Sequence, residues 1–123
     1  FKRLFGESIE NDPISRLSTC EKFAKKHSLT ILLKGQEDII TNGELSYTNS
    51  TNSPCMTVGG TGDVLSGLVS GFLSRNKNLV EAACTATFVN GSTGELLQKE
   101  IGNHILASDL ISKLPTVLNS FYD

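Results

Sequence analysis

Val58–Gly67 reads VGGTGDVLSG, and this stretch restricts the fold of the chain more than any other. Three glycines lead into the apolar pairs of an amphipathic helix, and Asp63 stands where that helix begins. Glycines permit a tight turn and a close approach to the backbone, while a helix start offers unpaired N–H groups and the positive end of the helix dipole. The stretch therefore predicts an anion-binding turn with a carboxylate beside it.

A carboxylate at such a turn suits phosphoryl transfer. Next to bound phosphates, it can orient and deprotonate the hydroxyl that attacks a phosphoryl group. The plainer interpretation is that Asp63 only favours the helix dipole and that the glycines only form a turn. Because the spacing matches neither G-x-G-x-x-G nor G-x-x-x-x-G-K-[S/T], the spacing alone leaves both interpretations open.

The apolar spacing after this turn predicts a helix over residues 61–75, with Val64, Leu65, Leu68 and their neighbours on one face. Two glycines on its other face weaken a helix, and we expect them to allow close approach of a neighbouring backbone. This helix is therefore expected to be deeply packed.

Three more helices are predicted elsewhere. Asn11 and Asp12 as possible caps and Pro13 in the first turn indicate a helix from about 13 to 27. Residues 79–99 read as one helix with a weak point at Asn90-Gly91, and a last helix is expected from Ser108 or Asp109, bent or interrupted at Pro115.

The strand signals lie between the helices predicted at 13–27 and 61–75. Residues 29–33 (LTILL) form a short apolar run typical of a strand buried on both faces, as in a parallel sheet. Residues 38–41 and 44–48 flank Asn42-Gly43, which is a strong hairpin signal, and residues 49–57 read as a loop. A helix followed by a buried strand indicates an α/β fold.

Composition excludes several classes of protein. The chain has 123 residues, which allows one domain, and its 38% hydrophobic and 20% charged residues argue against disorder. A net charge of −2 lacks the cationic excess that nucleic acid or anionic lipid would attract. No apolar run approaches the roughly 18 residues of a membrane span. Three scattered cysteines in no C-x-x-C pair indicate reduced thiols in a cytoplasmic protein and no zinc site.

Four segments together resemble one family. Met56–Gly67 (MTVGGTGDVLSG) is similar to the signature of the ADP- or ATP-dependent NAD(P)H-hydrate dehydratases, a branch of the ribokinase-like superfamily. Phe1–Gly6 (FKRLFG), Leu32–Gly35 (LLKG) and Leu106–Pro115 (LASDLISKLP) resemble further segments of that family in the same order. The resemblance runs from end to end of the chain but covers only the C-terminal part of the family's domain.

The resemblance implies the C-terminal part of a ribokinase-like three-layer α/β/α sandwich, with a mainly parallel sheet extended by the hairpin at 38–48. Residues 1–123 are then a single domain or a C-terminal fragment of one. The helix at 61–75 and the strand at 29–33 are expected to be covered by segments outside the chain. An exposed apolar patch then favours a homo-oligomer or association with the missing part of the domain.

The resemblance also implies a reaction, the repair of hydrated NADH or NADPH. ADP or ATP phosphorylates the ring hydroxyl, phosphate then leaves, and Mg²⁺ neutralises the phosphates. Asp63 is the implied base and contacts the hydrated nicotinamide ring. The implied nucleotide-binding residues fall in two groups, Gly60, Thr61 and Gly62 at the phosphates and Lys34, Gly35, Gln36, Glu37 and Asp38 along the adenine nucleotide.

Two departures from the family pattern stand out. Asn52-Ser53-Pro54-Cys55 replaces its Gly-Asn-Pro-Gly, and Asn90-Gly91 replaces its His-Gly. Cys55 is either a small side chain packed in the loop or a thiol near the phosphates, and we favour packing. Two alternative functions stay open. One is a kinase of a sugar, vitamin precursor or other small alcohol, and the other is a chain that binds adenine nucleotide or a partner subunit without catalysis.

Overall fold

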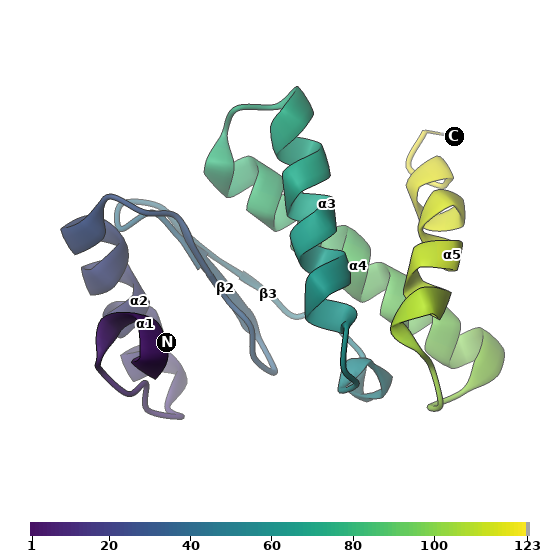
Figure 1. Ribbon diagram of the computed structural model, residues 1–123, viewed down its shortest axis with the longest axis horizontal. Coiled ribbons are helices and arrows are strands. Elements are labelled where there is room, and N and C mark those ends of the chain that lie inside the picture. The colour runs from purple at the N-terminus through teal and green to yellow at the C-terminus, as the bar shows by residue number, and fades with distance from the viewer. Residues whose placement is uncertain (123) are drawn as a thin grey trace.

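A computed structural model describes residues 1–122, in which a small sheet lies between helices (Figure 1). In chain order the elements are α1 (Lys2–Phe5), α2 (Pro13–His27), β1 (Ile31–Leu33), β2 (Asp38–Thr41), β3 (Ser46–Asn49), the 3-10 helix η1 (Pro54–Met56), α3 (Thr61–Arg75), α4 (Leu79–Ile101) and α5 (Ala107–Asn119). In Figure 1, α1 and α2 lie on one side of the strands, and α3, α4 and α5 lie on the other. The predicted helices at 13–27 and 61–75 are confirmed.

The sheet has the order β1-β2-β3, and both pairs of neighbours are antiparallel. Short connections at 34–37 and 42–45 reverse the chain, whereas a parallel pair needs a crossover of a dozen or more residues. The predicted α/β class and the hairpin are thus confirmed. The sheet formed by residues 1–122 is nevertheless antiparallel, not mainly parallel as expected.

The central strand is the best-covered part of the sheet. All four residues of β2 are buried, and Ile40 packs with Val80 and Ala83 of α4. By contrast, all three residues of β1 are only half-buried, because β1 is an edge strand with β2 on one side. Within residues 1–122, β1 is therefore not buried on both faces, as is expected if segments outside the chain cover it.

Helix α3 is less covered than its sequence predicts. Only Thr61 and Leu65 are buried, and no atom lies within 4 Å of where a Cβ on Gly67 or Gly71 would stand. Within residues 1–122, deep packing and a closely approaching backbone are therefore not seen, which agrees with the expectation that segments outside the chain cover this helix. Gly67 and Gly71 instead line the open groove between α3 and α5, where α5 does not come close to their backbone.

Helices α4 and α5 both continue past positions where the sequence predicts weakness. Helix α4 passes without a break through Asn90 and Gly91, which are buried. Helix α5 continues through Pro115, which is exposed, so the predicted interruption does not occur. It begins at Ala107, and Asp109 lies in its first turn, where the carboxylate accepts the Leu106 N–H at 2.7 Å. The predicted cap, Ser108 or Asp109, thus lies two or three residues after the observed N-cap residue, Leu106.

A second hydrophobic cluster joins the loop before α3 to the helical layer. It contains Cys55, Met56, Leu97, Ile105 and Leu110, with Val64 packed against it. Cys55 is therefore a packed side chain, as predicted.

All three cysteines are free thiols, and burial raises the pKa of the Cys20 and Cys84 thiols. Within residues 1–122, no helix has the length and apolar character needed to cross a membrane.

Candidate nucleotide-binding and catalytic site

The start of α3 leaves backbone N–H groups free for an anion. Gly60 is the N-cap residue, and its carbonyl accepts the N–H groups of Asp63 and Val64, both at 3.1 Å. Among residues 1–122, the N–H groups of Thr61 and Gly62 have no hydrogen-bond partner, as expected for a first helical turn. Two free donors at the positive end of a 15-residue helix are the geometry that an anion-binding turn requires.

Gly60 is required at this turn for two reasons. Its φ of 92° lies in the left-handed region, and a Cβ would stand 2.9 Å from the Cβ of Ala107. The glycine therefore lets the loop enter α3 while the first turn of α5 packs against it.

Thr61 has a role that sequence reasoning missed. Its buried hydroxyl lies 3.0 Å from the carbonyl oxygen of Met56 and 3.1 Å from that of Val58, so it donates to the preceding loop. The loop is thereby fastened to the helix that it precedes. It is the backbone N–H of Thr61, and not its hydroxyl, that remains available for a phosphate.

The Lys34–Asp38 turn is also held by its own chain. Asp38 is 3% exposed, and its carboxylate accepts the Gly35 N–H at 3.0 Å. The Arg16 guanidinium donates to the Lys34 carbonyl at 3.3 Å. Asp38 therefore shapes the turn, while the exposed Lys34 side chain is free to meet a ligand.

One cleft brings most of the predicted nucleotide-binding residues together. Its volume is about 760 Å³, and it lies between the Lys34–Asp38 turn, the loop at 52–58 and the start of α3. Of the residues predicted from the sequence, it is lined by Lys34, Gly35, Gln36, Asp38 and Thr61. The loop adds residues that the sequence analysis did not assign to a site, namely Asn52, Ser53, Pro54, Met56, Thr57 and Val58. The sequence signal that could have identified these loop residues is their position directly before the glycine turn.

The remaining predicted residues surround this cleft without lining it. Glu37 lines an adjoining hollow together with Arg16, and Gly62 lines a hollow shared with Lys34 beside β1. Gly60 and Asp63 line the end of a groove between α3 and α5. The first turn of α3 is therefore a ridge at which three hollows meet.

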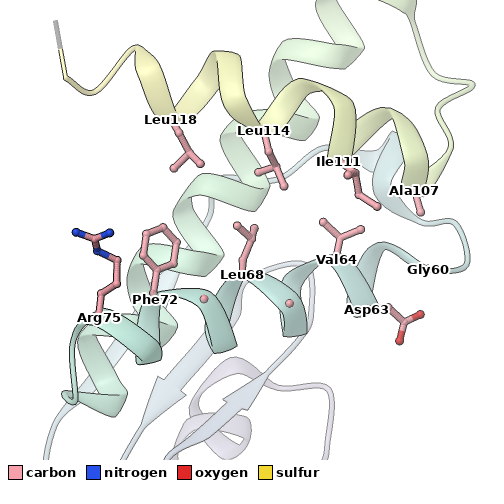
Figure 2. A pocket seen from close by; sticks show the side chains of 12 residues that line it. Gly60, Asp63, Val64, Leu68, Phe72, Arg75, Ala107, Ile111, Leu114 and Leu118 are labelled. Carbon is pink, nitrogen blue, oxygen red and sulfur yellow. The ribbon is translucent and has the colours of Figure 1, made fainter.

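Asp63 stands on that ridge as an exposed side chain. In Figure 2 it lies at the N-terminal end of α3 and points away from α5. Its carboxylate accepts no hydrogen bond from residues 1–122, so both oxygens are open to a ligand. Because Asp63 follows Gly62 in the chain, it is adjacent to the anion-binding turn.

The groove between α3 and α5 is apolar along its length. Its volume is about 590 Å³, and the facing side chains in Figure 2 are Val64, Leu68 and Phe72 of α3 and Ile111, Leu114 and Leu118 of α5. Its charged lining residues, Asp63 and Arg75, stand at its two ends, so the apolar middle offers a phosphate or a ribose no polar side chain. The 760 Å³ cleft, which is lined by Lys34, Gln36, Asn52 and other polar residues, is the better candidate for a nucleotide.

The residues at the site do not form a cage for a metal ion. Within residues 1–122, no group of three or more His, Cys, Asp or Glu side chains could hold one. This donor set suits Mg²⁺ that arrives with a nucleotide, because Mg²⁺ keeps several waters and takes much of its coordination from substrate phosphates.

The fold and the glycine-rich helix start define the class to which the chain belongs, the α/β domains of ribokinase-like type. The solved structure of the ADP/ATP-dependent NAD(P)H-hydrate dehydratase from Bacillus subtilis, co-crystallised with ATP/Mg²⁺, matches 98% of the chain with a TM-score of 0.89 and 28% identity. The match spans 44% of that chain. Residues 1–116 match the family described as NAD(P)H-hydrate dehydratase, and the chain belongs to this family.

Curated relatives agree with this family over nearly the whole chain. The ADP-dependent (S)-NAD(P)H-hydrate dehydratases of Nitrosopumilus maritimus and Cenarchaeum symbiosum are 47% and 49% identical over 121 residues. The bifunctional NAD(P)H-hydrate repair enzyme of Pyrobaculum aerophilum is 45% identical over the same length. The chain spans 42% of the first two relatives and 24% of the third.

Proposed function

We propose that the full-length protein carrying these residues repairs hydrated NADH or NADPH at the expense of a nucleotide. The observation that carries this proposal is the cleft in which the Lys34–Asp38 turn, the loop at 52–58 and Thr61 meet, next to an exposed Asp63. The names of the two relatives at 47% and 49% identity favour ADP over ATP as the phosphoryl donor.

The nucleotide binds in the cleft with its phosphates toward α3. The free N–H groups of Thr61 and Gly62 then donate to phosphate oxygens, and the Lys34 ammonium lies at the cleft wall to offset their charge. Mg²⁺ bound with the nucleotide supplies further neutralisation of the phosphates. The adenine and ribose extend along the Lys34–Asp38 turn, where Gly35 and Gln36 line the cleft.

Asp63 acts as the base that starts the reaction. It takes the proton of the ring hydroxyl of the hydrated dinucleotide as that oxygen attacks the terminal phosphorus, and AMP leaves when ADP is the donor. The carbon–oxygen bond then breaks, phosphate departs, and loss of a ring proton restores the double bond of the dihydronicotinamide. The open position of Asp63 at the helix start allows the substrate to approach from outside the nucleotide cleft.

The test is turnover by the full-length protein with ADP or ATP, followed by the return of dihydronicotinamide absorbance. Replacing Asp63 by Asn should lower kcat by about a hundredfold or more while ADP still binds, because general-base catalysis contributes about that much. Glu44→Gln, which removes another exposed carboxylate far from the cleft, is the matched control.

Two outcomes would contradict the proposal. A wild-type protein that accumulates a phosphorylated alcohol is a small-molecule kinase, since its product does not eliminate phosphate. A protein that binds ADP without turnover of any hydrate is a binding module.

A further inference from the structure

One face of α4 is shaped to receive the loop that forms a wall of the nucleotide cleft. A Cβ on Gly91 would stand 1.7 Å from the carbonyl oxygen of Thr51, and a Cβ on Gly94 would stand 2.1 Å from Sδ of Met56. Residues 91, 94 and 98 are spaced three and four apart and therefore share a helix face. The two buried glycines explain how the loop from Thr51 to Met56 can lie directly on α4.

Gln98 lies on the same face of α4, and both the oxygen and the nitrogen of its side-chain amide form hydrogen bonds. Its Oε1 accepts the Ser53 hydroxyl at 2.6 Å, and its Nε2 donates to Oδ1 of Asn103 at 2.7 Å. Ser53 is 4% exposed and caps η1, where its oxygen lies 3.4 Å from the Cys55 N–H. The hydrogen bond from Ser53 to Gln98 therefore fixes the start of η1 against α4.

These contacts continue from Gln98 to the anion-binding turn. Ser53, Pro54 and Met56 line the cleft, and the Met56 carbonyl receives the Thr61 hydroxyl at 3.0 Å. A path of direct contacts thus runs from α4 through η1 to the first turn of α3. Gln98 itself does not line the cleft.

We propose that Gln98 is a positioning residue for the nucleotide, acting through Ser53 on the cleft wall. This inference rests on the proposed function, because it takes the cleft to be the nucleotide site. It predicts an effect on nucleotide affinity more than on the chemical step. The reason is that the first turn that carries Asp63 is held by the Gly60 carbonyl, not by Gln98.

Three variants of the full-length protein separate the hydrogen bond from simple packing. Gln98→Leu has a similar size but bonds neither Ser53 nor Asn103. Gln98→Glu keeps an acceptor for the Ser53 hydroxyl, and the Asn103 amide can turn its NH₂ toward the new carboxylate. Ser53→Ala removes the same bond from the other side and remains informative if Gln98→Leu does not fold.

The readouts are the Kd for ADP with Mg²⁺, kcat at saturating nucleotide, and amide hydrogen exchange without nucleotide. Loss of the partly buried hydrogen bond to Ser53 should raise the Kd in Gln98→Leu about threefold to tenfold, with kcat changed less than about twofold. Exchange should quicken at Met56 and Thr57, whose N–H groups donate to the carbonyls of Ser53 and Pro54. Gln98→Glu should stay within about twofold of wild type, and Ser53→Ala combined with Gln98→Leu should cost little more than either alone.

The outcomes distinguish this inference from the proposed function. A folded wild-type protein that binds neither ADP nor ATP overturns the proposed function and the nucleotide cleft together. A wild type that binds ADP while Gln98→Leu binds equally well, with unchanged exchange at Met56, overturns only the positioning role. Equal losses in Gln98→Leu and Gln98→Glu would also overturn it, because the acceptor for Ser53 would then be irrelevant.

Discussion

The hydroxyl of Thr61 is expected to stabilise the loop before α3 and not to hold phosphate directly. It is 6% exposed and has two carbonyl acceptors, those of Met56 at 3.0 Å and Val58 at 3.1 Å. Thr61→Val keeps the shape of the side chain but removes the donor, which leaves a buried carbonyl without its partner. The free energy of unfolding should fall by about 1–3 kcal/mol, the usual range for leaving a buried polar group unpaired.

Thr61→Ser is the matched control, because it keeps the hydroxyl and removes one methyl group. That loss should lower the free energy of unfolding by only about 0.8 kcal/mol. The assay is equilibrium urea unfolding of the full-length protein followed by circular dichroism, with the Kd for ADP measured by calorimetry on each folded variant. In Thr61→Val the Kd should rise only modestly, since the backbone N–H of Thr61 still faces the phosphates.

One result would refute this reasoning about Thr61. If Thr61→Val is as stable as wild type but no longer binds ADP, the hydroxyl meets the ligand and does not fasten the loop. If Thr61→Ser loses as much stability as Thr61→Val, the methyl group and not the hydroxyl is the stabilising part.

Three further predictions concern Lys34, Gly60 and the cap of α2. Lys34→Met should raise the Kd for ADP about tenfold, because a charge-assisted contact to phosphate is lost, and calorimetry should show no such loss for the exposed control Lys77→Met. Gly60→Ala should lower the free energy of unfolding by about 1–2 kcal/mol or more, the cost of placing alanine in the left-handed region. Gly59→Ala should leave the free energy of unfolding unchanged, because a Cβ on Gly59 would have no atom within 4 Å. Hydrogen bonds from the Ser15 N–H and hydroxyl hold the pKa of Asp12 below its ordinary 3.8, so its stabilising effect is complete above that pH and is lost as the pH falls through the lowered pKa. Acid titration of Asp12→Asn should therefore show a shallower loss of stability below pH 3.8 than wild type does.

Local signals in the sequence predict most of the helices and the hairpin. Asp12 and Pro13 mark the start of α2 because a cap and a first-turn proline act within a few residues of the chain. The same holds for Asn42-Gly43, where the Asn42 side chain accepts the N–H groups of Glu44 and Leu45 at 2.9 and 2.8 Å. These interactions need no partner from elsewhere in the fold.

The errors arise where a distant segment decides the outcome. Asn90-Gly91 reads as a weak point in a helix, yet α4 continues there because Gly91 is the place where the Thr51 carbonyl lies against it. Residues 29–33 read as a strand buried on both faces, and within residues 1–122 β1 pairs only with β2 and is half-buried, since its expected cover is a segment outside the chain. Contacts between segments far apart in the sequence, such as that of Thr51 with Gly91, cannot be predicted from a local sequence pattern.

The candidate site divides in the same way. The glycine turn, the helix after it and the carboxylate at its start can be read from VGGTGD, because a helix start and its free N–H groups are properties of consecutive residues. That Lys34, the loop at 52–58 and Thr61 line one cleft could not be read from the sequence, since they approach one another only when the hairpin and α4 pack together. The use of the Thr61 hydroxyl and the support from Gln98 likewise depend on contacts that the folded chain creates. Consecutive residues thus determine the predicted anion-binding turn, whereas the shape of the candidate nucleotide cleft depends on long-range packing.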